Sequence, residues 1–141
     1  GPLLDAAPRA LTIANRTPAN AQALVERFAA SRASGVAGVL TASSYAQLAG
    51  STFDVVIDAT SAGLAASVPP LPDDVFAAGS LAYAMVYGPA AAAFLDFARA
   101  HGAARVADGL GMLVEQAAES FFVWRGVRPD VAPVIESLRG A

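Results

Sequence analysis

The chain has 141 residues, of which 55% are hydrophobic and 15% are charged, and its formal net charge is −3. This balance excludes an extended disordered chain, which needs low hydrophobicity and high charge. The acidic charge excludes a broad surface for binding nucleic-acid phosphates. The sequence has no Cys and a single His, and all of its basic residues are Arg. Disulfides, thiol nucleophiles, Cys-ligated zinc and Lys-based catalysis are therefore excluded for this chain alone.

The sequence also bears on localisation. No apolar run of about 18 residues is free of charge, so we predict no transmembrane helix. Residues 1–8 lack the basic and apolar regions of a signal peptide, and the chain has no initiator Met. We expect a cytoplasmic protein or a part of one, with neither a membrane nor a nucleic acid as partner.

Helix-like and strand-like segments alternate from the first residues. Residues 1–7 resemble the end of a helix that stops before Pro8, because a residue before proline avoids helical angles. Residues 10–14 form a short apolar run that is typical of a buried strand. Thr17 is a suitable N-cap for a helix over residues 18–31, which begins with proline. The inward face of this helix is predicted to carry Leu24, Val25 and Phe28.

The middle of the chain is predicted to contain two strands and two short helices. We expect a strand over residues 36–41 and a short helix over residues 43–49, capped by one of the serines at its start. Residues 53–59 are nearly all apolar and β-branched, as in a central strand that is covered on both faces. Residues 60–72 contain glycine and prolines and are predicted as a loop. Residues 72–79 are predicted as another short helix that ends at glycine.

The last part of the chain continues the alternation. His101 and Gly102 are expected to end a helix, with the glycine in the left-handed conformation. The predicted elements are a strand over residues 80–87, a helix over 91–100, a strand over 104–107, a helix over 112–125 and a helix over 130–138. The whole pattern predicts one α/β domain over residues 1–141, Rossmann-like and doubly wound, with a mainly parallel sheet and helices on both faces.

Four loops follow the carboxyl ends of the predicted strands, where parallel sheets bind ligands. They are residues 15–18, 60–64, 87–89 and 108–112. In the first loop, Asn15, Arg16 and Thr17 stand where a dinucleotide fold meets the adenosine ribose. Arg16 suits a 2′-phosphate, which a guanidinium binds with paired hydrogen bonds. A simple N-cap with an exposed Arg explains the same residues.

The other loops offer hydroxyls, glycines and apolar side chains. Thr60, Ser61 and Ala62 can hold a phosphate or ribose through hydroxyls and free N–H groups, or form an ordinary turn. The glycines of the last loop let a flat ring approach the backbone. Met85 or Met112 would pack against such a ring beside Gly109. Gln116 could donate to a substrate hydroxyl or carboxylate, and Tyr87 is a candidate for contact with a ligand. Core packing is the alternative for Met112, and a solvated amide is the alternative for Gln116.

A phosphate-binding Gly-x-Gly-x-x-Gly between a first strand and a first helix is missing. The chain is expected to begin inside that helix, so the sheet would lack its usual central strand. The strands at residues 10–14 and 53–59 would then have open edges, which invite pairing. We expect a partner chain that supplies the strand, as in a homodimer, or a rearranged sheet, or a larger protein of which the chain is a part.

Taken together, the four loops resemble those of shikimate dehydrogenase. The resemblance rests on Ala-Asn-Arg-Thr-Pro (14–18), Ile-Asp-Ala-Thr-Ser-Ala-Gly-Leu (57–64), Leu-Ala-Tyr-Ala-Met-Val-Tyr-Gly-Pro (81–89) and Asp-Gly-Leu-Gly-Met-Leu-Val-Glu-Gln-Ala-Ala (108–118). It covers only the C-terminal, NADP-binding part of that two-domain enzyme. The family reversibly reduces 3-dehydroshikimate to shikimate with NADPH in aromatic amino-acid biosynthesis.

The resemblance implies a role for each loop. The NADP(H) ligands would be Asn15, Arg16, Thr17, Thr60, Ser61, Ala62, Met85, Gly109 and Met112. The substrate, shikimate or 3-dehydroshikimate, would meet Tyr87 and Gln116 in the intact enzyme. The family's catalytic Lys and Asp belong to its N-terminal domain, so this chain would hold no catalytic residue and would be inactive alone. We also expect no metal site, because the chain has a single His and no Cys.

Some positions depart from the family pattern. Asn20 stands where the family has a second basic residue, Asp58 where it usually has Asn, and Ala84 where it usually has Asp. A carboxylate beside a phosphate cleft would repel the phosphate. A non-catalytic nucleotide-binding or interaction module of the same fold is therefore one alternative. A quinate-using relative is another, although Arg16 argues against its NAD-dependent form.

Overall fold

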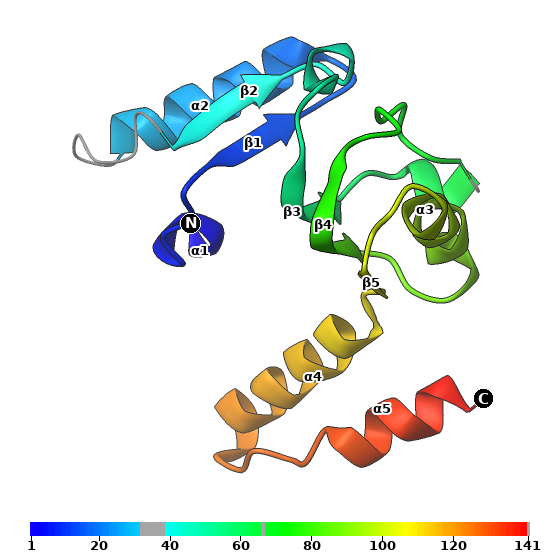
Figure 1. The fold of residues 1–141 in the computed structure, drawn as a ribbon. Helices are drawn as coiled ribbons and strands as arrows, with labels where there is room; N and C mark the ends of the chain where they lie inside the picture. Colours follow the sequence, from blue (N-terminus) through cyan, green and yellow to red (C-terminus); the bar gives the residue numbers. More distant parts are fainter. Residues whose placement is uncertain (32–38, 66, 141) are drawn as a thin grey trace. The chain divides into compact units, whose positions relative to one another are not determined.

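The computed structural model describes residues 1–31, 39–65 and 67–140. The chain divides into two compact units (Figure 1). The N-terminal unit comprises Gly1–Ser51 and Pro70–Val75, and the C-terminal unit comprises Thr52–Pro69 and Phe76–Ala141. Both units combine parallel strands with helices, so the predicted α/β class is confirmed. The assignment of residues 1–141 to one domain stays a prediction.

The N-terminal unit is a two-stranded parallel sheet covered by a helix. Its elements are α1 (Pro2–Asp5), β1 (Leu11–Ala14), α2 (Pro18–Ser31), β2 (Leu40–Ser43) and the 3-10 helix η1 (Ala46–Leu48). The strands pair in parallel from Leu11 opposite Leu40 to Ala14 opposite Ser43, and α2 packs against both strands. Short apolar strands of this kind are stable only when a helix covers one face, which α2 does here.

The inward face of α2 differs from the prediction at one position. Ala21 is buried and Val25 and Phe28 are half-buried, but Leu24 is exposed. The buried positions follow the spacing i, i+4, i+7, which places them on one side of a helix. Leu24 lies at the edge of this side, about 60° from Ala21 at 3.6 residues per turn. Because it is exposed, the prediction that it faces inward is wrong.

The second strand ends later than predicted. Residues 36–38 of the predicted strand lie outside the described residues, and β2 ends at Ser43. Ser44 makes hydrogen bonds of the kind expected for the predicted cap, but η1 begins at Ala46 with Tyr45 at its N-cap position. The Gln47 N–H donates to Ser44 Oγ (3.3 Å), and the Ser44 N–H donates to Gln47 Oε1 (2.9 Å). This reciprocal pair satisfies two N–H groups that a helix start leaves free.

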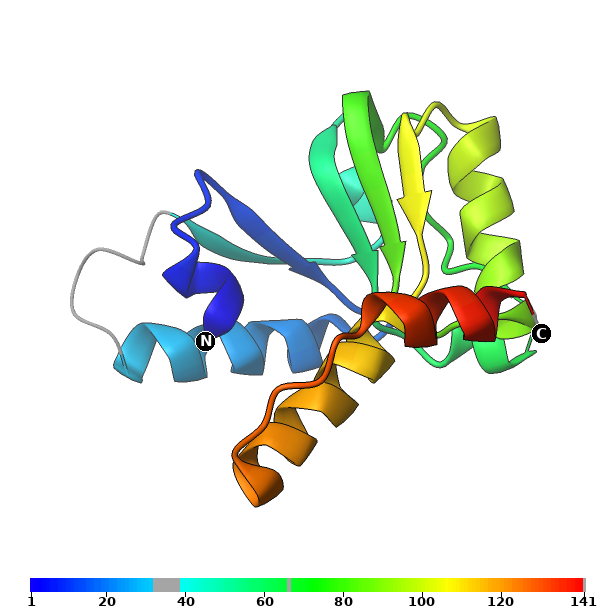
Figure 2. The same ribbon diagram turned by 90° about the horizontal axis from the view of Figure 1, so that it is seen from below.

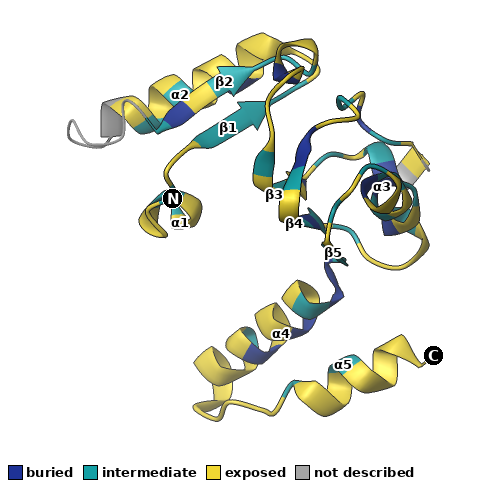
Figure 3. Ribbon diagram, in the orientation of Figure 1, coloured by how far each residue is buried: buried dark blue, intermediate teal, exposed yellow. Residues whose placement is uncertain are grey.

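The C-terminal unit is a three-stranded parallel sheet of order β3-β4-β5 (Figure 2). Its elements are β3 (Phe53–Asp58), the 3-10 helix η2 (Ala62–Ala65), β4 (Phe76–Ala84), α3 (Pro89–Ala100), β5 (Arg105–Ala107), α4 (Leu110–Arg125) and α5 (Ala132–Arg139). Helix α3 packs against β4 and β5. The buried side chains of the unit concentrate on β4, α3 and α4, as the dark blue ribbon in Figure 3 shows, and include Ala82, Phe94, Ala98 and Val114.

The short helix predicted over residues 72–79 is wrong. The chain makes only a turn at Asp73 and Asp74, and β4 begins at Phe76. Val75 and Phe76 are both buried, and burial of two apolar residues outweighs a weak helix signal. The pairing register with β3 shifts between Phe53 and Val55, and Gly79 takes a φ of 80° within the irregular part of β4.

The outer strands of both sheets have an edge without a partner strand among the described residues. Among the described residues, β1 pairs only with β2, and β3 pairs only with β4. Val55 of β3 is 51% exposed and Ile57 is also exposed. The prediction that this strand is covered on both faces is therefore wrong for this chain, because no described element covers these two side chains.

None of the helices in the described part of the chain combines the length and apolarity needed to cross a membrane.

Candidate functional site

Two buried glycines lock together the three loops that follow β3, β4 and β5. A Cβ added to Gly63 would lie 2.3 Å from the carbonyl oxygen of Ala90 and 3.2 Å from Cγ2 of Val86. A Cβ added to Gly109 would lie 2.2 Å from the carbonyl oxygen of Met85. Neither position has room for a side chain. The loops therefore touch through their backbones at the carboxyl end of the sheet, where α/β folds bind ligands.

Hydrogen bonds join the same loops. The Gly109 N–H donates to the carbonyl oxygen of Val86 (2.9 Å), and the Met85 N–H donates to the carbonyl oxygen of Asp58 (2.9 Å). The Gly88 N–H donates to Asp108 Oδ2 (3.3 Å). Each of the three strand ends is thus bonded to a neighbour. We call these connected loop segments, around Gly63, Met85–Gly88 and Asp108–Gly109, the glycine-locked platform.

Two methionines expose apolar surface beside this platform. Met85 is 42% exposed and Met112 is 40% exposed, and the backbone of Met85 contacts Gly109. Core packing of Met112, the alternative drawn from the sequence, does not occur. Tyr87 and Gln116 are exposed as well, whereas Tyr83 is half-buried. Tyr87 lies in the loop beyond the end of β4 at Ala84, so the strand predicted over residues 80–87 is wrong at its C-terminal end.

The loop after β3 uses its own polar groups to form its turn. Asp58 is only 6% exposed, and its Oδ1 accepts a hydrogen bond from the Thr60 N–H (2.9 Å). The Ala62 N–H donates to Thr60 Oγ1 (3.1 Å). The expectation of free N–H groups at Thr60 and Ala62 is therefore wrong, because the turn into η2 already satisfies both. Ser61 is exposed at the surface of this loop.

In the N-terminal unit, the loop after β1 presents a single guanidinium. Asn15 Oδ1 accepts a hydrogen bond from the Thr17 N–H (2.8 Å), which closes a tight turn around Arg16. The Arg16 side chain is exposed, and within the described ranges it forms no ion pair. Asn15 therefore shapes the loop, and Arg16 remains available to an anion.

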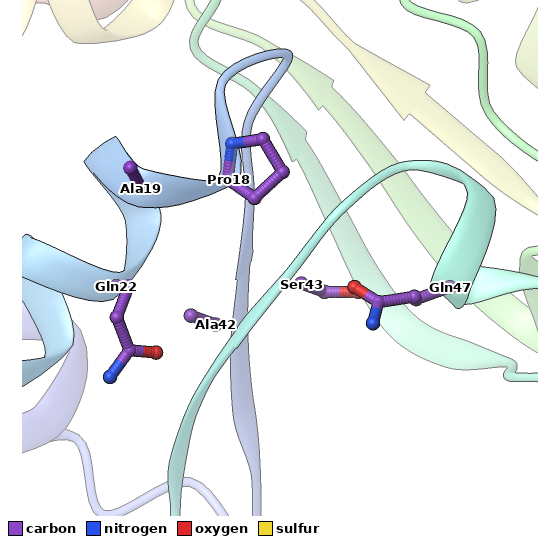
Figure 4. Close-up of a pocket in the computed structure, with 6 residues that line it drawn as sticks. All are labelled: Pro18, Ala19, Gln22, Ala42, Ser43 and Gln47. Carbon is purple, nitrogen blue, oxygen red and sulfur yellow. The ribbon is translucent and has the colours of Figure 1, made fainter.

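A depression of about 280 Å³ lies beside this loop, between the start of α2 and the end of β2 (Figure 4). Its lining consists of Pro18, Ala19, Gln22, Ala42, Ser43 and Gln47. Gln22 and Gln47 lie on opposite sides of it, with Ala42 between them. The sequence reasoning missed this lining. Its only local signal is the spacing of four between Pro18 and Gln22, which places both on one side of α2.

The described residues hold no group of three or more His, Cys, Asp or Glu that could bind a metal ion. The loops described above offer backbone, hydroxyl, amide and guanidinium groups to a ligand. Arg16 belongs to the N-terminal unit, while the glycine-locked platform belongs to the C-terminal unit.

A known family matches the part of the chain that contains the second glycine. Residues 109–139 match the family model of the shikimate 5'-dehydrogenase C-terminal domain. The shikimate dehydrogenase (NADP(+)) of Nitrosospira multiformis is 54% identical over 140 residues, which is 99% of this chain and 49% of that protein. The chain is similar to the C-terminal half of shikimate dehydrogenases. The resemblance predicted from the four loops is thereby confirmed.

Solved structures support the same relationship. An Ael1 enzyme from Pseudomonas putida is 50% identical with a TM-score of 0.83, over 97% of this chain and 48% of that one. Shikimate 5-dehydrogenase from Thermus thermophilus, solved with NADP(H) and shikimate, is 30% identical with a TM-score of 0.73, over 97% and 48%. The chain spans about half the length of these shikimate dehydrogenase relatives.

Proposed function

We propose that this chain is the NADP(H)-binding part of a shikimate dehydrogenase, which reversibly reduces 3-dehydroshikimate to shikimate. The observation that carries the proposal is the glycine-locked platform, where Gly109 contacts Met85 and two exposed methionines offer a surface for a flat ring. Of these residues, Gly109 and Met112 lie within residues 109–139, which match the model of the shikimate 5'-dehydrogenase C-terminal domain.

The residues present fit the cofactor. Arg16, which forms no ion pair in the part of the chain that the structure describes, would hold the 2′-phosphate, with Asn15 and Thr17 shaping its loop. The loop of Thr60, Ser61 and Ala62 would line the dinucleotide, through the Ser61 hydroxyl rather than the two bonded N–H groups. The platform residues Met85, Gly109 and Met112 would contact the nicotinamide, which supplies a hydride when bound.

The substrate would meet the exposed side chains of Tyr87 and Gln116. Reduction of a carbonyl to an alcohol needs a proton as well as a hydride, and we assign the proton donor to the half of the enzyme that this chain does not span. The chain alone is then inactive. Mixing it with shikimate and NADP+ and following the absorbance of the reduced nicotinamide tests this, and sustained turnover would contradict it.

A second candidate is a non-catalytic nucleotide-binding or interaction module of the same fold. The buried carboxylate of Asp58 favours it, because a negative charge at the end of β3 weakens phosphate binding. Asn20 favours it as well, since a second basic side chain beside Arg16 is missing.

Calorimetric titration with NADPH and NADH separates these candidates. We expect tighter binding of NADPH, and loss of this preference in Arg16→Ala, by about tenfold to a hundredfold for a charge-assisted contact. NADH binding should not change. Arg9→Ala, which removes another exposed guanidinium of the N-terminal unit, is the matched control. Absence of binding for both NADPH and NADH favours the second candidate, as a non-catalytic interaction module that does not bind the cofactor.

The free edges of β1 and β3 support a proposal about partners. We infer that each edge pairs with a further strand. Its source is either another part of a longer chain or a second copy of this chain in a homodimer. Sedimentation of the chain in solution tests the second source, because a monomer excludes it. We also propose that the intact enzyme acts in aromatic amino-acid biosynthesis and is located in the cytoplasm.

A further inference from the structure

The carboxylate of Asp108 lies where two loops of the platform meet. Asp108 follows β5 directly and is half-buried. Its Oδ2 accepts a hydrogen bond from the Gly88 N–H (3.3 Å), in the loop between β4 and α3. Its Oδ1 accepts one from the Leu110 N–H (3.3 Å), at the first residue of α4. One side chain thus holds the ends of two different loops.

The bond to Gly88 adds a second tie between this loop and the β5–α4 turn, beside the hydrogen bond from the Gly109 N–H to Val86. Gly88 takes a φ of 62°, which favours glycine, and the following Pro89 has no N–H to donate. The Gly88 N–H is therefore the donor through which the end of this loop can be tied to the β5–α4 turn. Three residues before it in the chain, Met85 contacts Gly109 through its backbone.

Only a short side chain with two acceptor atoms satisfies both N–H groups. Asparagine has the same shape but one acceptor, and its amide NH2 would face an N–H group. Serine can still accept from the Leu110 N–H as a local cap, but its hydroxyl lies on a shorter stem than the second carboxylate oxygen. The two substitutions therefore separate the bond across the loops from the local cap.

We propose that Asp108 is a positioning residue, which sets the separation of Met85 and Met112 for the nicotinamide end of the cofactor. The proposal rests on the proposed function and adds a residue that does not itself contact the ligand. It acts through Gly88 and the β4–α3 loop on one side, and through Leu110 and the start of α4 on the other.

Binding of two ligands by the 141-residue chain tests the proposal. NADPH carries the nicotinamide, whereas 2′-phospho-ADP-ribose carries the adenosine end, the diphosphate and the second ribose but no nicotinamide. We expect Asp108→Asn and Asp108→Ser each to weaken NADPH binding by about tenfold. Both should leave the binding of 2′-phospho-ADP-ribose unchanged, and amide hydrogen exchange at Gly88 should become faster. Asp54→Asn, which removes the same charge from an exposed position on β3, should change neither ligand.

Unchanged NADPH binding in both variants would overturn the proposal. An equal loss for both ligands would overturn it too, because it would indicate a general role in folding. If Asp108→Ser binds NADPH like the unsubstituted chain, the local cap is sufficient and the bond across the loops has no positioning role. Failure of the unsubstituted chain to bind either ligand is a different result, which overturns the proposed function and this inference together.

Discussion

Replacing Gly109 with alanine tests the close packing of the platform. The added Cβ would lie 2.2 Å from the carbonyl oxygen of Met85 and 2.8 Å from its carbonyl carbon. Both atoms are backbone, so the clash cannot be relieved by rotating a side chain. The β4–α3 loop must move away from the start of α4, which also strains the hydrogen bond from the Gly109 N–H to Val86.

The size of the effect follows from these contacts. Overpacking a close contact costs about 1–3 kcal/mol, and a lost hydrogen bond adds about 1 kcal/mol. We therefore expect Gly109→Ala to lower the free energy of unfolding by about 2–4 kcal/mol. NADPH binding should weaken as well, because the substitution displaces Met85 from the platform.

Gly111, two residues further along, provides a matched control. Nothing lies within 4 Å of an added Cβ there, and the residue is inside α4. Because alanine is the better helix former, Gly111→Ala should raise the free energy of unfolding by about 1 kcal/mol. Urea unfolding followed by far-ultraviolet circular dichroism measures both variants. Equal midpoints for Gly109→Ala and the unsubstituted chain would refute the packing argument, and so would equal destabilisation by both variants.

Three further substitutions follow from the same structure. Gly63→Ala should destabilise by about 2 kcal/mol in urea unfolding, because its Cβ would lie 2.3 Å from the carbonyl oxygen of Ala90, and an unchanged midpoint would contradict this. Ser80 Oγ is buried without a hydrogen-bond partner among the described residues. Ser80→Ala should therefore leave the free energy of unfolding unchanged or raise it by up to about 1 kcal/mol, as measured by thermal unfolding. A clear loss of stability would show that the hydroxyl is hydrogen-bonded. Asp58→Asn keeps the acceptor for the Thr60 N–H and removes a negative charge. The affinity for NADPH, measured by calorimetry, should therefore rise about twofold, as expected for one unit charge at roughly 10 Å from a phosphate in a water-like dielectric. A fall in affinity would argue against a phosphate near Asp58.

Local patterns were sufficient to predict most elements and the order in which they occur. The apolar run before Asn15, the proline at the start of α2 and the β-branched run of β3 each act within a few residues. Arg16 could be placed at a strand end for the same reason. The loops after β3, β4 and β5 were also recognisable as a group, because their polar and glycine-rich residues follow apolar runs.

Contacts between distant segments decided the rest. Gly63 lies against Ala90 and Gly109 against Met85, and no local pattern shows why these glycines leave no room for a Cβ. The same holds for the start of β4, where burial of Phe76 outweighs a local helix signal. Local propensity therefore predicted where loops occur, whereas the site itself depends on backbone contacts between loops that are more than 20 residues apart in the chain.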